Sequence, residues 1–271
     1  MATSIHPTAI VAKGAQLGEN VTIGAFSVIG GQVSIGDHTY LHSSVVIDGR
    51  TTLGSNNQVF PFTCLGTAPQ HVKYEGEEST LTIGNNNLIR EHVTMHKGAK
   101  VGAMHTEIGS NNMFMVGSHV AHDCILGSHI LMANNAILGG HVEVGDNVYI
   151  GGGTAVQQFV RIGHSTIIGG KSAVIEDVIP FARAVGNRCR LLGINVIGLR
   201  RQGFSKTRIA DLRAAWHLLF KDKDLGTFKE RLAEVKTRYG GHADVKEIIA
   251  FIDAEGKQPI MQAGEDIDAA A

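Results

Sequence analysis

The sequence predicts a parallel β-helix over residues 1–186, followed by a small C-terminal helical domain over residues 187–271. Three observations support this fold class. Aliphatic residues recur at every sixth position, glycine is abundant at 34 residues, and the recurrence stops where apolar residues adopt helical spacing. A period of six fits neither an α-helix nor a hairpin meander. It fits short strands separated by turns, each with one side chain directed toward an interior axis.

The hexapeptide repeat extends over residues 5–65 without a missed step. The frame is lost over residues 67–80, returns over 83–101, and resumes one residue out of step over 108–174. Three hexapeptides make one triangular coil, and coils stack about 4.8 Å apart, as hydrogen-bonded strands do. About ten coils would give a prism on the order of 50 Å long. Asn and Gly, as in residues 84–87, supply the positive φ that the corners need.

Two segments interrupt the repeat. Thr67–Thr80 is polar and carries Lys73, and Ala99–Thr106 consists mainly of small residues, which predicts a flexible segment. Loops that interrupt a rigid scaffold often carry function. The alternative is that both are tolerated surface insertions.

The C-terminal segment shows helical spacing. We expect helices over Lys206–Lys221, Leu225–Tyr239 and Ala243–Ala254. Ser205 is a suitable N-cap for the first of them.

Composition excludes several classes of protein. A net charge of −1 does not favour nucleic-acid binding. The three cysteines, Cys64, Cys124 and Cys189, are widely spaced and form no CxxC motif, which favours neither a disulfide scaffold nor a cysteine zinc site. The N-terminus shows no signal-peptide pattern, and no apolar run approaches the roughly 20 residues that span a bilayer. We therefore expect a cytoplasmic protein without membrane insertion.

Charge is uneven near the end of the repeat. Residues 178–210 contain no acidic side chain but seven cations: Arg183, Arg188, Arg190, Arg200, Arg201, Lys206 and Arg208. Such a stretch can attract an acidic partner or hold a phosphate, or it can be a solvated face.

Histidine is abundant, with 14 residues. His122 and His141 are 19 residues apart, about one coil, and His96 and His119 are 23 apart, about one coil plus an insertion. These side chains should therefore lie on neighbouring coils of one edge. Asp123 follows His122 and could orient its ring at a corner, which suits a general base. A metal site and purely structural hydrogen bonding remain open from the residues alone.

Several motifs spread over nearly the whole chain carry a family resemblance. They are residues 5–10 (IHPTAI), 69–74 (PQHVKY), 89–96 (IREHVTMH), 119–124 (HVAHDC), 133–135 (ANN), 139–141 (GGH), 186–187 (GN) and 203–205 (GFS). In these motifs the sequence resembles the UDP-N-acetylglucosamine O-acyltransferases, which catalyse the first step of lipid A synthesis. The resemblance implies a left-handed coil and a homotrimer with active sites between neighbouring β-helices.

The resemblance also implies roles for particular residues. His122 would be the general base that activates the sugar 3-hydroxyl, Asp123 would orient it, and the Gly140 N–H would stabilise the oxyanion. The implied substrate-binding residues are Gln70, Lys73, His96, His119, His141, Gln158, Asn195 and Arg201. No metal or cofactor is implied. The acyl donor would be an (R)-3-hydroxyacyl group on acyl carrier protein, an acidic partner that suits the basic stretch.

Gly170 falls at the position that sets acyl-chain length in this family. Because glycine cannot close the groove with a side chain, a long chain is expected. The sequence departs from the family pattern at four positions that bear on sugar and nucleotide contacts: His71, Gln157, Ile197 and Gln202.

Competing functions come from other classes. A 3-amino UDP-sugar could replace the 3-hydroxyl acceptor, or another hexapeptide acyltransferase could use coenzyme A. A γ-type carbonic anhydrase uses the same β-helix with three histidines on zinc, and its metal content would distinguish it. A non-catalytic β-helix would lose nothing on substitution of His122.

Overall fold

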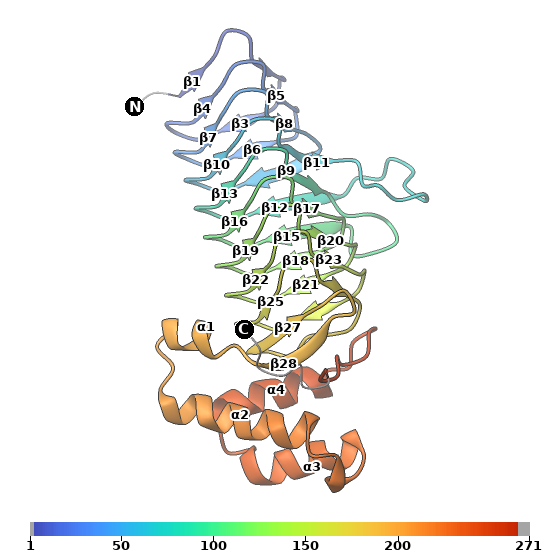
Figure 1. Cartoon of the computed structure of the whole chain (residues 1–271). Helices are drawn as coiled ribbons and strands as arrows, with labels where there is room; N and C mark the ends of the chain where they lie inside the picture. Colours follow the sequence, from blue (N-terminus) through green and yellow to red (C-terminus); the bar gives the residue numbers. More distant parts are fainter. Residues whose placement is uncertain (1–2, 265–271) are drawn as a thin grey trace.

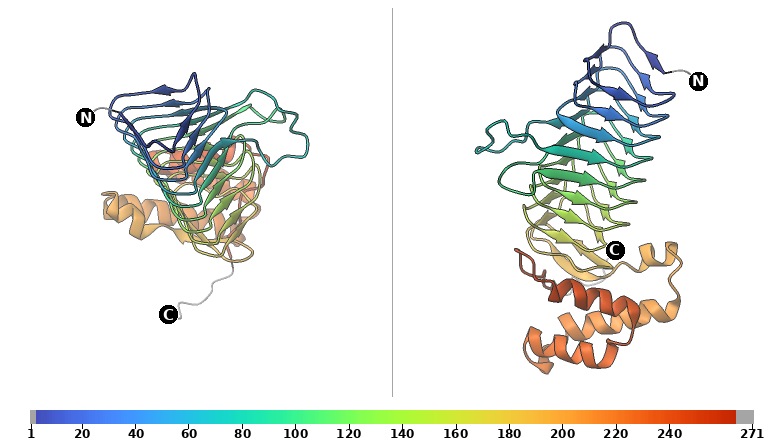
Figure 2. Two further views of the ribbon diagram at one scale, coloured as in Figure 1. Left: turned by 90° about the horizontal axis from the view of Figure 1, so that it is seen from above. Right: turned by 180° about the vertical axis from the view of Figure 1, so that it is seen from behind.

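The computed structural model describes residues 3–264, and within them the chain forms a triangular prism of stacked coils with a helical cap (Figure 1). Viewed along the prism, the three walls are separate sheets (Figure 2). The first sheet contains β1 Ser4–Ile5, β4 Thr22–Ile23, β7 Tyr40–Leu41, β10 Gln58–Val59, β13 Leu88–Ile89, β16 Met113–Phe114, β19 Leu131–Met132, β22 Tyr149–Ile150, β25 Ile167–Ile168, β27 Ala182–Val185 and β28 Arg190–Ile194.

The second sheet contains β2 Ile10–Val11, β5 Val28–Ile29, β8 Val46–Ile47, β11 Cys64–Thr67, β14 Thr94–His96, β17 His119–Val120, β20 Ile137–Leu138, β23 Ala155–Val156 and β26 Ala173–Val174. The third contains β3 Gln16–Leu17, β6 Ser34–Ile35, β9 Arg50–Leu53, β12 Thr80–Ile83, β15 His105–Ile108, β18 Ile125–Leu126, β21 Glu143–Val144 and β24 Arg161–Ile162. Each strand pairs in parallel with the strand one coil away, except the antiparallel β27–β28 pair. The predicted three strands per coil are confirmed.

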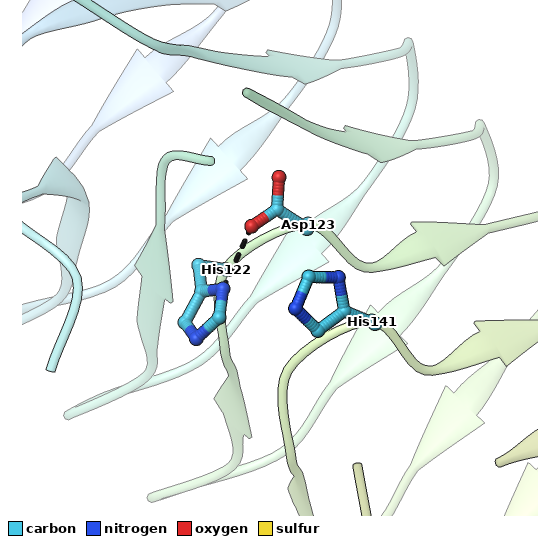
Figure 3. A group of neighbouring side chains, drawn as sticks. All are labelled: His122, Asp123 and His141. Atoms are coloured by element: carbon cyan, nitrogen blue, oxygen red, sulfur yellow. Dashed lines mark hydrogen bonds and ion pairs between the residues drawn. The ribbon is translucent and has the colours of Figure 1, made fainter. Parts of the chain in front are cut away.

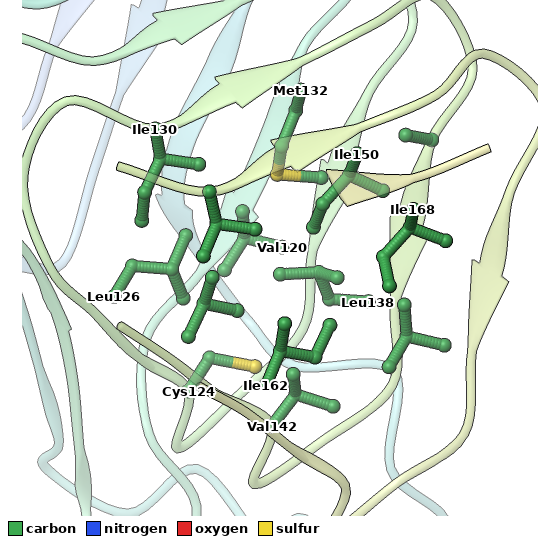
Figure 4. Close-up of a cluster of buried hydrophobic side chains, with 14 of the residues drawn as sticks. Val120, Cys124, Leu126, Ile130, Met132, Leu138, Val142, Ile150, Ile162 and Ile168 are labelled. Carbon is green, nitrogen blue, oxygen red and sulfur yellow. The ribbon is translucent and has the colours of Figure 1, made fainter. Parts of the chain in front are cut away.

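The hexapeptide positions form the core, as predicted. From Ile23 to Val174, with the exception of Val101, they are almost wholly buried along the prism axis, as Figure 4 shows for part of the stack. Ile5 is 45% exposed because, among the described residues, the first coil is covered by a neighbouring coil on one side only. The prediction was wrong at Val101, which is 45% exposed in the loop after β14. The insertion there shifts the register before β15 begins.

The corners confirm the expected left-handed backbone conformations. Asn86 and Asn111 have φ of +57° and +60°, as the asparagine-rich motifs predict. Bulkier residues adopt the same conformation at other corners, including His141 and Phe159 with φ of +62° and +67°. The corners therefore present imidazole and aromatic side chains at the edges of the prism.

The helical cap contains α1 Val196–Arg201, α2 Lys206–Phe220, the 3₁₀ turn η1 Lys223–Leu225, α3 Phe228–Tyr239 and α4 Ala243–Asp253. Three helices were predicted and are confirmed, but α3 starts three residues later than expected. Its capping box at Thr227 and Glu230 fixes that start. The short α1 and strand β28 were not predicted. The predicted boundary after residue 186 falls in the turn between β27 and β28, so β28 still belongs to the first sheet. No helix within the described range is long and apolar enough to cross a membrane.

The N-cap residue of α2 offers a test of what stabilises the helical domain. The Ser205 hydroxyl accepts a hydrogen bond from the Arg208 N–H at 3.2 Å. Ser205→Ala leaves that donor without its cap and should lower the free energy of unfolding by about 1 kcal/mol. Urea denaturation would measure the loss, with the exposed Thr207→Ala inside the same helix as the control. Equal effects of the two substitutions would contradict a capping role.

Candidate active site

Coil stacking brings the histidines together on one edge of the prism. His119 in β17 lies opposite Thr94 of β14, and the His141 N–H donates to the His122 carbonyl at 3.0 Å. The rings of His96 and His119 have centroids 4.9 Å apart, and those of His122 and His141 are 5.1 Å apart. The prediction from spacing that these four residues share one edge is confirmed.

His122 and Asp123 form a buried pair at a corner (Figure 3). Asp123 has φ of +58°, which turns its side chain back toward the preceding residue. The His122 Nδ1 lies 2.7 Å from the Asp123 Oδ2, and the two residues are only 8% and 5% exposed. A carboxylate in this position fixes the ring and favours the tautomer with its proton on Nδ1. Within residues 3–264, Nε2 of His122 has no hydrogen-bond partner and is left to accept a proton.

The second interruption of the repeat holds Asp123 in place. The Ala99 N–H donates to the Asp123 Oδ2 at 3.0 Å, and the Asp123 N–H donates to the Thr106 hydroxyl at 2.8 Å. Burial opposes ionisation of Asp123, but the hydrogen bonds from His122 and Ala99 outweigh it and lower the pKa of the carboxyl. Asp123 is therefore a carboxylate that can stabilise a protonated His122.

The other histidines are arranged to stay neutral. His141 stacks on Phe159 with centroids 4.4 Å apart, and its pKa is lowered by burial despite the nearby Asp123 carboxylate. The His119 Nδ1 lies 2.7 Å from the Thr94 hydroxyl, and burial lowers its pKa too. Burial, with the charges of His119 and His122, lowers the pKa of His96 to about 4. Neutral rings can bind hydroxyl groups as either donor or acceptor.

The buried His96 predicts a dependence of stability on pH. Its folded-state pKa lies below the value of about 6.5 expected when unfolded, so between these values the unfolded chain binds a proton that the folded chain does not. Stability should therefore rise with pH through this window and fall as pH drops from about 6.5 to 4, by about 3 kcal/mol from His96. Urea unfolding of His96→Gln should show a shallower decline, whereas exposed His129→Gln should match the native protein. An unchanged slope in His96→Gln would assign the decline to other groups.

A pocket of about 340 Å³ opens in front of the His122 ring. It is lined by Gln70, His71, His96, His119, Ala121, His122, Ile137, Leu138, Gly139, Gly140, Val156 and Gln158. Gly140 is in close contact with the base, because a Cβ built there would lie 2.7 Å from the His122 Cε1. Within the described chain, the Gly140 N–H donates to no other group. The pocket therefore combines a proton acceptor with a free backbone donor, an arrangement suited to acyl transfer.

Some predicted site residues lie elsewhere in the chain. Lys73 is exposed on the loop between β11 and β12, which projects from the prism (Figure 1). Asn195 and Arg201 lie at the two ends of α1 in the helical cap, and Gly170 is exposed after β25. None of these four lines the pocket at His122. Asn195 is buried as the N-cap of α1, with its amide donating to the Ser165 carbonyl at 2.9 Å.

Two residues that shape the site were not among its predicted members. The ring of His71 lies edge-on to His122 with centroids 5.2 Å apart, so this departure from the family pattern is part of the pocket wall. Gly102 packs over Asp123 and His141 so closely that a Cβ would lie 2.4 Å from an atom of each. The only signal for Gly102 was its place in an interruption of the repeat. The loop was predicted to be flexible, but its backbone contacts the buried carboxylate.

The prediction about the basic stretch needs revision. Of the basic stretch, Arg190 pairs with Glu176 at 2.7 Å and Arg208 pairs with Asp244 at 2.6 Å, so both are neutralised by acidic residues outside the stretch. At the His122 corner, His122, Asp123 and His141 offer ligand atoms that all lie within 4.8 Å of one another, which keeps open the metal-site alternative raised by the residues alone.

Comparison with known proteins gives a consistent assignment. A family model described as "Udp N-acetylglucosamine O-acyltransferase; Domain 2" matches residues 177–261. Acyl-(acyl-carrier-protein)–UDP-N-acetylglucosamine O-acyltransferases from Bartonella bacilliformis and Azorhizobium caulinodans are 50% and 48% identical over 94% of this chain, covering 93% and 94% of their own lengths. The solved structure of LpxA from Acinetobacter baumannii matches with a TM-score of 0.92 and 41% identity, covering 95% of this chain and 99% of that one. The chain belongs to the acyl-(acyl-carrier-protein)–UDP-N-acetylglucosamine O-acyltransferase family.

Proposed function

We propose that the protein transfers an (R)-3-hydroxyacyl chain from acyl carrier protein to the glucosamine 3-hydroxyl of UDP-N-acetylglucosamine, the first step of lipid A synthesis. The observation that carries the proposal is the pocket lined by both His122, tied to Asp123, and Gly140, whose N–H has no acceptor within the described chain. Relatives about half identical to this chain are named acyl-(acyl-carrier-protein)–UDP-N-acetylglucosamine O-acyltransferases. That name supports acyl carrier protein as the carrier of the donor and UDP-N-acetylglucosamine as the acceptor.

In this reaction His122 acts first as a base. Its Nε2 removes the proton from the sugar 3-hydroxyl while the oxygen attacks the thioester carbonyl, and the carbonyl electron pair moves to oxygen. The Gly140 N–H donates to this oxyanion. When the intermediate collapses, the C–S bond breaks and the leaving sulfur takes the proton from His122. Asp123 stabilises the imidazolium between these steps. The thioester already activates the acyl group, so neither a metal nor a cofactor has a step to perform.

The complete site lies between subunits of a homotrimer. This is supported by the separation of the proposed substrate-binding residues within one chain. Gln70, His96, His119, His141 and Gln158 lie at or beside the pocket, whereas Lys73 projects outward next to Val72, which is 100% exposed. The loop that carries Lys73 would bind substrate when it reaches the pocket of a neighbouring subunit. Asn195 and Arg201 in the helical cap would then hold the nucleotide.

The remaining features follow from the same proposal. The coil is left-handed, as in other hexapeptide-repeat proteins, and residues 1–186 and 187–271 act as β-helix and helical domains. Gly170 borders the acyl groove and permits a long chain. The other five cations of the basic stretch, which have no acidic partner among the described residues, attract acidic acyl carrier protein in the cytoplasm.

The direct test is transfer from 3-hydroxymyristoyl-acyl carrier protein to UDP-N-acetylglucosamine by the purified native protein. Product formation with the 3-hydroxyl sugar, and little with its 3-amino analogue, supports the proposal. Transfer could instead be efficient only to the 3-amino sugar, only with shorter acyl chains, or only from coenzyme A. Each of these results would change one proposed substrate and leave the assignment as an acyltransferase in place. A folded protein that acylates none of these acceptors would reject it.

Lys73 provides a separate test of the loop. Removing its charge in Lys73→Ala should raise the KM for the UDP-sugar by about tenfold or more, because hydrogen bonds to charged groups contribute about 1.5–3 kcal/mol. The value of kcat should change far less, because Lys73 does not line the pocket at His122. Steady-state kinetics would compare this variant with Lys229→Ala, an exposed lysine on α3. An unchanged KM would remove Lys73 from the binding site.

A further inference from the structure

The corner that holds the base also has the composition of a metal site. His122, Asp123 and His141 supply two imidazoles and one carboxylate, and their ligand atoms lie within 4.8 Å of one another (Figure 3). Two histidines and a carboxylate are an established ligand set for zinc with an open fourth position. Tetrahedral zinc with bonds of about 2.0–2.1 Å requires donors roughly 3.3 Å apart, so small rotations of the side chains suffice.

The surroundings favour metal binding at this corner rather than at the other histidines. The Asp123 side chain is 1% exposed, and its Oδ1 is buried without a hydrogen-bond partner. A second carboxylate oxygen is thus available while Oδ2 keeps its bond from Ala99. Gly102 covers Asp123 and His141 from outside, and the pocket in front of His122 gives access.

We propose that His122, Asp123 and His141 form a zinc(II) site, and that zinc bound there blocks acyl transfer. Zinc takes the place of the proton on Nδ1 of His122, that proton moves through solvent to Nε2 so that the ring stays neutral, and water completes the coordination. The base can then no longer accept the proton of the acceptor hydroxyl. The metal also occupies the space beside the pocket that the acceptor needs. The inhibition, unlike the binding, rests on the role proposed above for His122.

Binding is tested on the full-length, tag-free protein after dialysis against a chelator. Cobalt(II) serves as the spectroscopic probe, because a tetrahedral site gives an intense visible band that zinc(II) abolishes by competition. About one equivalent per chain should bind. The decisive variant is His141→Asn, which removes the imidazole while asparagine tolerates the φ of +62° at this corner. His129→Asn is the matched control, an exposed histidine at a corner with φ of +59°.

The proposal expects the cobalt band in the native protein and in His129→Asn, and its loss in His141→Asn. A band that persists in His141→Asn, or native protein that binds no metal, overturns it. If His141→Asn fails to fold, X-ray absorption of the zinc-loaded native protein decides instead. Two imidazole nitrogens and a carboxylate oxygen support the site, and a different ligand set rejects it.

Activity separates this inference from the proposed function. The metal-free native protein should transfer acyl groups, lose at least tenfold in rate when one equivalent of zinc is bound, and recover with excess chelator. Raising the concentration of UDP-N-acetylglucosamine should weaken the inhibition. A metal-free protein that is inactive would count against the proposed function and leave metal binding intact. Full activity with the site filled would overturn the inhibitory role.

Discussion

His122→Ala is expected to lower the rate of acyl transfer by about 10²–10⁴-fold, the usual contribution of a positioned general base. The substitution removes the group whose Nδ1 lies 2.7 Å from Asp123 and whose Nε2 faces the pocket. The loss should appear in kcat, because proton transfer occurs in the transition state, while the KM for the UDP-sugar should change less. Steady-state kinetics with both substrates would measure the two constants.

The controls for this experiment separate chemistry from folding. His122→Ala leaves Asp123 buried without its partner, so thermal unfolding must show that the variant remains folded at the assay temperature. His129→Ala removes an exposed histidine from another corner and should keep native activity. A folded His122→Ala protein with near-native kcat would assign base catalysis to another group. His141, whose ring lies 5.1 Å away, would be examined next.

The fold was predictable because each coil repeats one environment. A residue such as Leu138 packs against the equivalent residues of the coils above and below it. The period of six therefore specifies burial along the whole axis. The prediction failed where this symmetry ends. Val101 matched the frame but lies inside an insertion, and Ile5 belongs to a coil that is covered on one side only within the described residues. Helix α1 was missed because six residues are too few to show a helical period.

The site was predictable only as far as coil geometry determines it. The spacing of 19 residues placed His122 beside His141, and sequence adjacency placed Asp123 at the same corner. The path of an inserted loop follows no repeat, so the contact of Gly102 with Asp123 could not be anticipated. Contacts between residues distant in sequence could not be anticipated either. The ion pair in which Asp244 neutralises Arg208 is an example.

Gly140→Ala should lower activity by about 10²–10³-fold, comparable to the loss of an oxyanion donor, without unfolding the protein. Gly140 does not have a positive φ, so alanine fits its backbone conformation. The conflict is local, because the added methyl would lie 2.7 Å from Cε1 and 2.8 Å from Nε2 of His122. The imidazole must turn away, which breaks its alignment with Asp123 and with the acceptor. The methyl also fills the space where the oxyanion would meet the Gly140 N–H.

Two comparisons make this result interpretable. Gly241→Ala adds the same methyl at an exposed site with no atom within 4 Å of the new Cβ, and it should behave as the native protein. The double variant Gly140→Ala/His122→Ala should lose little more activity than either single variant, because both substitutions disable the same catalytic base. Fully additive losses would show that Gly140 acts independently of the base, as an oxyanion donor alone. Native activity in Gly140→Ala would show that neither the His122 ring position nor this N–H controls the rate.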